Sequence, residues 1–173
     1  MNIKKLLVIG FLFLLNPNYA LSDNPYFIDL KLILNQSDAG KKAQKYLKSK
    51  LDNGIKDLQQ KEKKILDEEK KIIQQKKVLS QEEYKNKVTE LRTKVSSLQK
   101  KRNSLLESVA KQRQKAKNEL LKTLNPILST YMKEKNIKMV IDKKEVLLAD
   151  ENLNITKDIM NLLNKKLKSI NLD

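Results

Sequence analysis

Apolar residues recur at every seventh position through much of the first half of the chain. Seven residues make about two turns of an α-helix, so this spacing places one apolar side chain per two turns on a single stripe. The other position of such a stripe holds Ile55 and then only charged residues, which makes the stripe thin. The pattern predicts a long, highly charged helix. Its stripe consists of Leu51, Leu58, Ile65, Ile72 and Leu79.

A second apolar pattern follows, with alternating spacings of three and four residues that are typical of a coiled-coil helix. Arg102 interrupts it at one expected apolar position. Because this pattern is denser than the first, we expect the second helix to be the stiffer of the two. Its apolar positions are Tyr84, Val88, Leu91, Val95, Leu98, Leu105 and Val109.

Ser80 and Glu83 lie between the two patterns with the spacing of a capping box, in which each side chain satisfies a free amide of a starting helix. A helix start at this point favours a chain reversal, so that the two stripes pack antiparallel. One continuous helix of about 80 residues, or ~120 Å at 1.5 Å per residue, is the alternative. We therefore predict a coiled-coil hairpin arm over residues 41–119.

Two places weaken the predicted helices. Asn53-Gly54 lies early in the first helix, and a glycine inside a helix costs about 1 kcal/mol relative to alanine. We expect a bend or soft point there. Pro126 lacks an amide hydrogen and its ring crowds the preceding turn, so we expect a kink or a restart of the helix with Asn125 as its cap.

The segments on either side of the arm have strand-like composition, and a terminal helix follows them. Thr156 is the expected cap of that helix, which spans 158–167 and buries Ile159, Leu162, Leu163 and Leu167. Lys143-Lys144 is the expected turn between the last two strands. Since the first strand precedes the arm and the others follow it, the sheet must close across the arm. The predicted strands are 26–30, 137–141 and 146–149, with Ile137, Met139 and Ile141 on one side.

The fold class expected from these elements is α+β and mostly α: a small β-sheet body, a long antiparallel coiled-coil helical hairpin and a C-terminal helix. The body is discontinuous, formed by residues 23–40 and 120–173. These segments total 72 residues, which bury little apolar surface, and the chain has no cysteine with which to form disulfides. We therefore expect the protein to self-associate.

The N-terminal segment has the features of an export signal. Lys4 and Lys5 precede ten apolar residues, and Ala20-Leu21-Ser22 offers small residues at the cleavage site. We predict that residues 1–22 are a signal peptide cleaved after Ser22. An uncleaved membrane anchor is less favoured, because a spanning helix needs about 20 apolar residues. Without a cysteine, lipid attachment at the cleavage site is excluded.

The positive charge of the chain is concentrated in the predicted arm. The whole chain has a formal charge of +16, and loss of Lys4 and Lys5 with the signal peptide leaves +14. Residues 41–119 hold 24 Lys/Arg and 11 Asp/Glu, a net +13. Such a surface attracts nucleic acid, anionic lipid or acidic protein segments. Export argues against nucleic acid as a physiological partner.

The chain contains no histidine and no cysteine, which removes the commonest proton shuttle and the thiol nucleophile. With glycine only at positions 10, 40 and 54, no glycine-rich phosphate loop is present. Adjacent carboxylates such as Glu68-Glu69 diverge by about 100° on a helix and do not converge on one atom. We therefore expect a protein that is not an enzyme and that uses no metal or cofactor.

Five short segments stand out along the chain: Phe27-Ile28-Asp29-Leu30, 37–44, 140–143, 146–150 and 153–156. Together they resemble the Skp (OmpH-like) family of periplasmic outer-membrane-protein chaperones. The resemblance implies a homotrimer whose helical arms enclose a cavity for unfolded outer-membrane proteins, without use of ATP. Pro126 and Asn53-Gly54 depart from the family pattern and leave the curvature of the arm open.

The function expected from charge and resemblance together is an ATP-independent periplasmic holdase. Long basic side chains supply both charge and aliphatic contact to an unfolded client. An anionic lipid or lipopolysaccharide surface is a further possible partner, and a structural spacer or adaptor of the cell envelope is the alternative function. The expected client-binding residues are Lys61, Lys64, Lys71, Lys77, Lys94, Lys101 and Arg113. The expected oligomerisation residues of the body are Ile28, Leu30, Ile137, Met139, Ile141, Val146 and Leu148.

Overall fold

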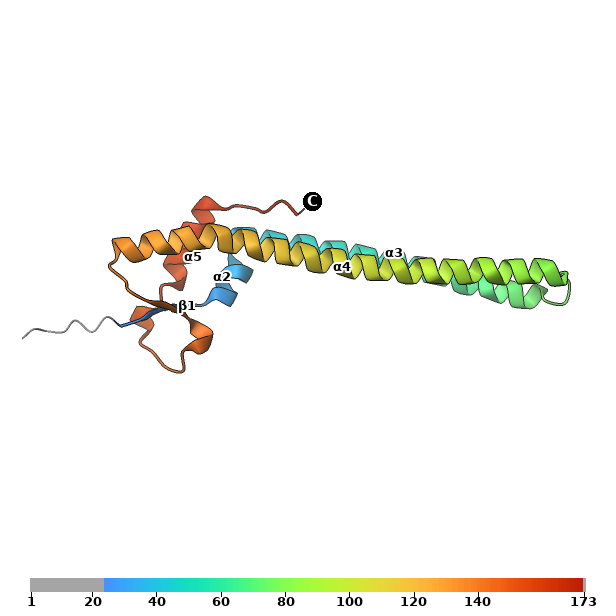
Figure 1. Cartoon of the computed structure of the whole chain (residues 1–173), viewed down its shortest axis with the longest axis horizontal. Coiled ribbons are helices and arrows are strands. Elements are labelled where there is room, and N and C mark those ends of the chain that lie inside the picture. Colours follow the sequence, from blue (N-terminus) through green and yellow to red (C-terminus); the bar gives the residue numbers. More distant parts are fainter. Residues whose placement is uncertain (1–23, 173) are drawn as a thin grey trace, which may run out of the picture.

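A computed structural model describes residues 24–172 of the chain. It consists of a long two-helix arm that projects from a small body at one end (Figure 1). The predicted signal peptide lies outside the described residues. The elements in chain order are β1 (Tyr26–Ile28), α2 (Leu30–Gln36), α3 (Asp38–Gln75), α4 (Gln81–Glu134), β2 (Val140–Asp142), the 3-10 turns η1 (Lys143–Glu145) and η2 (Glu151–Leu153), and α5 (Thr156–Lys166).

Helices α3 and α4 form the predicted antiparallel hairpin. The chain reverses between Gln75 and Gln81, and the predicted capping box is confirmed at the start of α4. The Ser80 hydroxyl accepts a hydrogen bond from the Glu83 amide (3.2 Å), and the Glu83 carboxylate accepts one from the Ser80 amide (3.0 Å). The 38 residues of α3 correspond to about 57 Å of helix at 1.5 Å per residue.

The seam of the arm follows the predicted stripe. Leu58 and Ile72 are buried and the other three members of the first stripe are half-buried. Arg102, which interrupts the second stripe, faces Glu62 of α3 at 3.7 Å. Two predicted seam residues lie outside it, since Ile55 is 40% exposed and Val95 is 49% exposed.

Neither Gly54 nor Pro126 ends its helix. Helix α3 runs through Gly54, and α4 runs through Pro126 to Glu134, so the expected restart at Asn125 is wrong. A proline inside a helix costs about 3 kcal/mol. Leu124 and Ile127 beside it are only 2% and 7% exposed, and burying each such side chain contributes roughly 1.5 to 3 kcal/mol. Packing therefore outweighs the local cost of the proline.

The sheet closes across the arm as predicted, but it is smaller than expected. Strands β1 and β2 are parallel, with Phe27 opposite Ile141, and Phe27 also pairs with Asn154. The prediction of a first strand through Leu30 is wrong, because the Asp29 carboxylate accepts a hydrogen bond from the Leu32 amide (2.7 Å) and starts α2 there. Helix α2 has no counterpart among the predicted elements.

The predicted third strand at 146–149 is also wrong. Asp142 caps η1 where a hairpin turn was expected, and the chain then loops outward with Leu147 and Leu148 almost fully exposed. The segment that pairs with β1 instead of this predicted strand contains Ile155, whose amide donates a hydrogen bond to the Phe27 carbonyl (3.0 Å). Residues 137–139 are not a strand either, so Ile137 is buried while Met139 is 56% exposed.

Helix α5 confirms the predicted terminal helix but not its cap. Thr156 is its first residue, and its hydroxyl accepts a hydrogen bond from the Asp29 amide (2.8 Å) and donates one to the Asn154 side chain (2.6 Å). Ile159 and Leu163 are fully buried as predicted, whereas Leu162 is 36% exposed. With Ile33 of α2 and Leu124 of α4, these side chains form the centre of the body.

The C-terminal tail runs back along the base of the arm (Figure 1). Leu172 is 4% exposed and packs with Ile170 against a small apolar cluster between α3 and α4. The Gln112 side-chain amide donates a hydrogen bond to the Leu172 carbonyl. This cluster consists of Ala43, Leu47, Val109 and Ala116.

Candidate functional site

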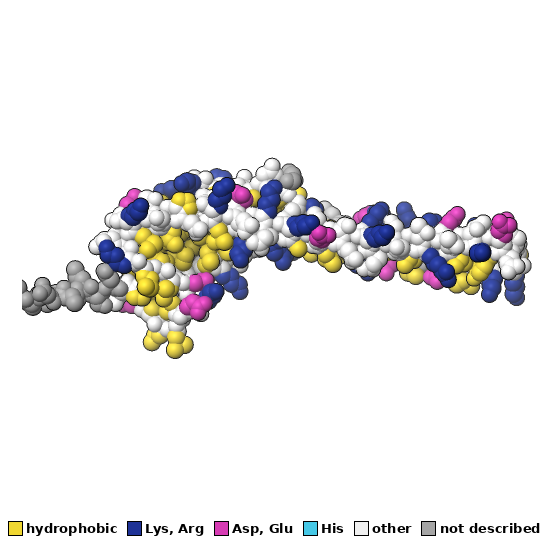
Figure 2. All heavy atoms as spheres, viewed as in Figure 1, with side chains coloured by type: hydrophobic (Ala, Val, Ile, Leu, Met, Phe, Trp, Pro, Cys, Tyr) yellow, Lys and Arg dark blue, Asp and Glu magenta, His cyan; other side chains and the backbone are white. Residues whose placement is uncertain are grey.

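Lysine and arginine side chains lie along the whole length of the arm, with fewer carboxylates between them (Figure 2). This distribution follows directly from the helical period, because only one narrow stripe of each helix packs against the other and the charged positions remain outside. No helix between residues 24 and 172 is long and apolar enough to cross a membrane.

A hollow of about 490 Å³ lies between α3 and α4 near the middle of the arm. Ile65 and Leu98 are its half-buried apolar residues. Helical spacing accounts for the grouping, because residues three or four apart lie on one face of a helix. Four of the seven predicted client-binding residues line this mid-arm hollow: Lys61, Lys64, Lys94 and Lys101.

The charges around the mid-arm hollow are partly neutralised within the chain. The Lys94 ammonium lies 2.5 and 2.7 Å from the two Glu68 carboxylate oxygens, and Lys61 pairs with Asp57. Lys64 and Lys101 take part in none of the ion pairs between residues 24 and 172. Of the four lysines that line the hollow, these two are therefore not paired with a carboxylate of the chain.

The other predicted client-binding residues lie elsewhere. Arg113 lines a larger groove of about 830 Å³ at the root of the arm. Lys71 lies near the far end of α3 and Lys77 in the turn, and both are exposed. The seven residues thus occupy three separate parts of the arm and do not converge on one site.

The sequence interpretation missed a set of exposed apolar side chains on the arm, which are between 50% and 81% exposed. Each belongs to a pair of adjacent apolar residues. For three of the four pairs, neighbours on a helix point about 100° apart, so only one of the pair packs between the helices and the other faces outward. Val78 instead lies in the turn between α3 and α4. Applying this 100° rotation to the helical pairs in the sequence would have identified their exposed members. They are Leu66, Ile73, Val78 and Leu106.

Hydrophobic side chains also gather on the viewed face of the body, beside the arm root (Figure 2). Among the predicted oligomerisation residues, Met139 is 56% exposed and Leu148 is 92% exposed. Ile28 and Ile137 are instead buried in the core of the body. Leu30, Ile141 and Val146 are half-buried. Leu147, which was not predicted, is fully exposed beside Leu148.

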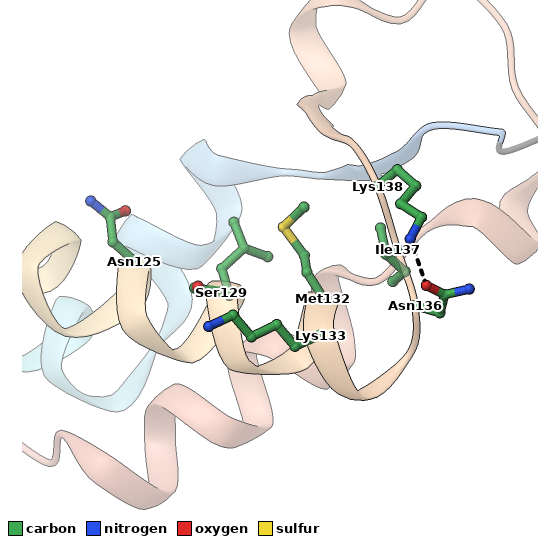
Figure 3. Close-up of a pocket in the computed structure, with 8 residues that line it drawn as sticks. Asn125, Ser129, Met132, Lys133, Asn136, Ile137 and Lys138 are labelled. Atoms are coloured by element: carbon green, nitrogen blue, oxygen red, sulfur yellow. Dashed lines mark hydrogen bonds between the residues drawn. The ribbon is translucent and has the colours of Figure 1, made fainter.

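A third hollow, of about 590 Å³, lies at the end of α4 (Figure 3). Met132 and Ile137 contribute apolar surface, and Lys138 donates a hydrogen bond to the Asn136 side chain (2.7 Å). The titratable side chains that line it are Lys133 and Lys138. Neither has a carboxylate partner in the hollow, so it holds no acid and base pair.

Tyr131 has a shifted pKa that follows from its place in the body. The Tyr131 hydroxyl donates a hydrogen bond to Asp158 (2.8 Å), and burial together with this carboxylate raises the pKa of Tyr131 to about 12. Residues 24–172 contain no group of three acidic, histidine or cysteine side chains that could hold a metal ion.

Comparison with known proteins agrees with the architecture. The family described as Outer membrane protein (OmpH-like) matches residues 26–163. The crystal structure of a proposed outer membrane chaperone (OmpH-like) from Caulobacter crescentus superimposes with a TM-score of 0.79 at 20% sequence identity, covering 87% of this chain and 90% of that one. No curated protein sequence matches the chain. Because the family match spans most of the sequence, this protein belongs to the family described as Outer membrane protein (OmpH-like).

Proposed function

We propose that this protein is an ATP-independent periplasmic holdase that binds unfolded outer-membrane proteins along its basic arms and prevents their aggregation. The observation that carries this proposal is the composition of the arm surface. Lys64 and Lys101 have no internal ion-pair partner, and outward-facing residues such as Ile73 and Leu106 add apolar area. Single exposed apolar side chains are common on protein surfaces, so it is their combination with unpaired lysines along the arm that favours contact with an unfolded chain.

Holding an unfolded chain requires many weak contacts that can rearrange. Lysine suits this task, because its four-carbon stem covers apolar surface while its ammonium attracts acidic groups. Flexible, adaptable surfaces of this kind bind many partners with little discrimination. Family membership favours this function over a structural spacer of the cell envelope, which was the alternative from sequence.

The proposed holdase is a homotrimer. One hairpin presents a surface but encloses nothing, whereas several arms projecting from joined bodies can surround a client. Leu147 and Leu148 extend from the body with almost no contacts of their own, and Met139 is also exposed. Association that covers these side chains would remove apolar area from water, at about 25 cal/mol per Å². An anionic lipid or lipopolysaccharide surface is a further proposed partner of the basic arm.

The test is aggregation of a chemically unfolded outer-membrane barrel protein on dilution, followed by light scattering, with residues 23–173 and no ATP. We expect suppression that saturates at a fixed ratio of oligomer to client. Lys64→Glu with Lys101→Glu should weaken it, because both side chains line the mid-arm hollow. Lys63→Glu with Lys100→Glu is the matched control, since these exposed neighbours carry the same charge outside it. No suppression by a folded, helical sample would refute the proposal.

A further inference from the structure

The groove at the root of the arm has an apolar floor. It lies where α2, α3 and α4 meet and has a volume of about 830 Å³. Small side chains, Ala43 and Ala116, leave room between the helices, and larger ones complete the floor. The buried residues of this floor are Ala43, Leu47, Val109, Ala116 and Leu120.

Two rows of basic side chains border this root groove. Lys41, Lys45 and Lys48 share one face of α3, and Arg113 and Lys117 stand on α4. No aspartate or glutamate lines the groove. The ion pairs formed within residues 24–172 include none of these five side chains. The positive charge around the root groove is thus not neutralised by carboxylates of the chain. In the mid-arm hollow, by contrast, Lys94 forms an ion pair with Glu68.

The protein itself shows what kind of segment packs on this cluster. The tail after α5 is not helical, and its residues Ile170 and Leu172, two apart in sequence, both contact the cluster that includes Ala43 and Val109. Alternate residues of an extended chain point to the same side, so this tail docks through one apolar face. None of its residues lines the root groove, which leaves the groove open.

We propose that the root groove binds a short extended polypeptide segment in which apolar residues alternate with acidic ones. The proposal rests on the holdase function and names the kind of client segment that this part of the arm takes. The apolar side chains face the floor, and the acidic ones face outward, where the flexible lysines of both rows reach them. A membrane surface fits less well, because the floor lies between helices and a flat bilayer cannot contact it.

The experiment measures binding of short fluorescein-labelled peptides to residues 23–173 by fluorescence anisotropy. The probe alternates valine with glutamate, and the comparison peptides alternate valine with lysine and serine with glutamate. We expect saturable binding of the valine-glutamate peptide and at least about tenfold weaker binding of the other two, because each lacks one of the two complementary features.

Charge reversal of one side chain in each of the two basic rows provides the structural test. Lys45→Glu with Arg113→Glu should weaken binding of the valine-glutamate peptide about tenfold or more. Lys42→Glu with Lys122→Glu makes the same change in net charge on the same helices outside the groove, and it should leave binding nearly unchanged. Circular dichroism checks that both variants keep their helices. Equal weakening by the two variants would overturn the proposal.

Cross-linking locates the bound peptide independently. The chain has no cysteine, so a benzophenone can be attached at Lys48→Cys alone, a position that lines the groove. We expect peptide cross-linking from this position and not from Lys56→Cys, farther along α3. Cross-linking of equal yield from both would overturn the proposal. Binding of phosphatidylglycerol vesicles that is lost in Lys45→Glu with Arg113→Glu, without cross-linking of the peptide from Lys48→Cys, would overturn it as well and make the groove a lipid site.

Failure of this proposal and failure of the holdase function give different results. A protein that suppresses aggregation but does not bind the valine-glutamate peptide is a holdase without a root-groove site. A protein that binds the peptide through both basic rows but does not suppress aggregation has the root-groove site, and the proposed holdase function is then refuted.

Discussion

Gly54 of α3 and Leu105 of α4 meet across the arm so closely that a Cβ atom on Gly54 would lie 2.5 Å from Leu105 Cδ2 and 2.6 Å from Cδ1. Glycine inside a helix costs about 1 kcal/mol relative to alanine. The uninterrupted helix shows that this glycine does not act as a break. Leu105 occupies the space that a side chain at position 54 would need.

Replacing Gly54 with leucine should lower the free energy of unfolding by about 1 to 3 kcal/mol, because the added side chain overpacks the seam. Leu105→Ala in the same chain should recover part of the loss. The measurement is urea unfolding followed by helical circular dichroism, analysed as a double-mutant cycle. Asn53→Leu is the matched control, since Asn53 is exposed. Additive effects of Gly54→Leu and Leu105→Ala would contradict this account of the glycine.

The capping box makes the tip of the arm sensitive to acid. Hydrogen bonds from Ser80 lower the pKa of Glu83 below its ordinary value of 4.5. A carboxylate with a lowered pKa contributes stability above its unfolded pKa, and this contribution is lost as the pH falls through the folded pKa. Unfolding of the wild type should therefore become easier below pH 4.5, and Glu83→Gln should be less stable at neutral pH and depend less on acid.

The matched control for the cap is Glu82→Gln, which removes a carboxylate from the same turn without touching Ser80. Ser80→Ala should cost about 1 kcal/mol, the usual loss for a helix cap. Thermal unfolding of the four proteins at neutral and acidic pH distinguishes these effects. If Glu82→Gln and Glu83→Gln behave alike, the capping box does not set the acid response.

The Tyr131 hydroxyl makes the body sensitive to alkali. Burial and Asp158 raise the pKa of Tyr131 from 10.0 to about 12, so the folded state retains this proton more tightly than the unfolded state. Stability is fully present below pH 10.0 and should fall as the pH rises toward about 12. Urea unfolding across this range should show a smaller loss for Tyr131→Phe than for the wild type. Tyr84→Phe, in the arm, should follow the wild type.

Thr156 joins two parts of the body that lie 127 residues apart in the sequence, through its bond from the Asp29 amide. Thr156→Val keeps the shape but leaves that amide without its partner. We expect a loss of about 1 to 3 kcal/mol in the free energy of unfolding, the cost of an unsatisfied buried group. Thr156→Ser keeps the hydroxyl and should cost less. A loss for Thr156→Ser as large as that for Thr156→Val would contradict this role of the hydroxyl, because serine keeps it.

Much of the arm could be predicted because its signals are local. The heptad spacing of residues such as Leu58 and Ile72 sets which side of α3 is buried, and the Ser80–Glu83 pair marks the start of α4. The pattern failed where a local preference competed with distant packing. Pro126 stays inside α4 because Leu124 and Ile127 are held in the core.

The candidate site was predictable in composition but not in arrangement. A basic arm follows from the lysine content alone. Which lysines lack an internal partner depends on the register of the two helices, which brings Lys94 to Glu68 and leaves Lys64 and Lys101 without one. The root groove depends on α2 as well, and no sequence pattern predicted that helix.

By itself, the sequence determined the long basic helices, their reversal and the absence of histidine and cysteine side chains. Helical period, capping and residue type act over a few neighbouring positions. Only the tertiary structure decided that Gly54 is a contact, that 146–149 is an exposed loop and that Thr156 holds Asp29. The physical reason is that each of these outcomes depends on a group far away in the sequence, whose position no local pattern encodes.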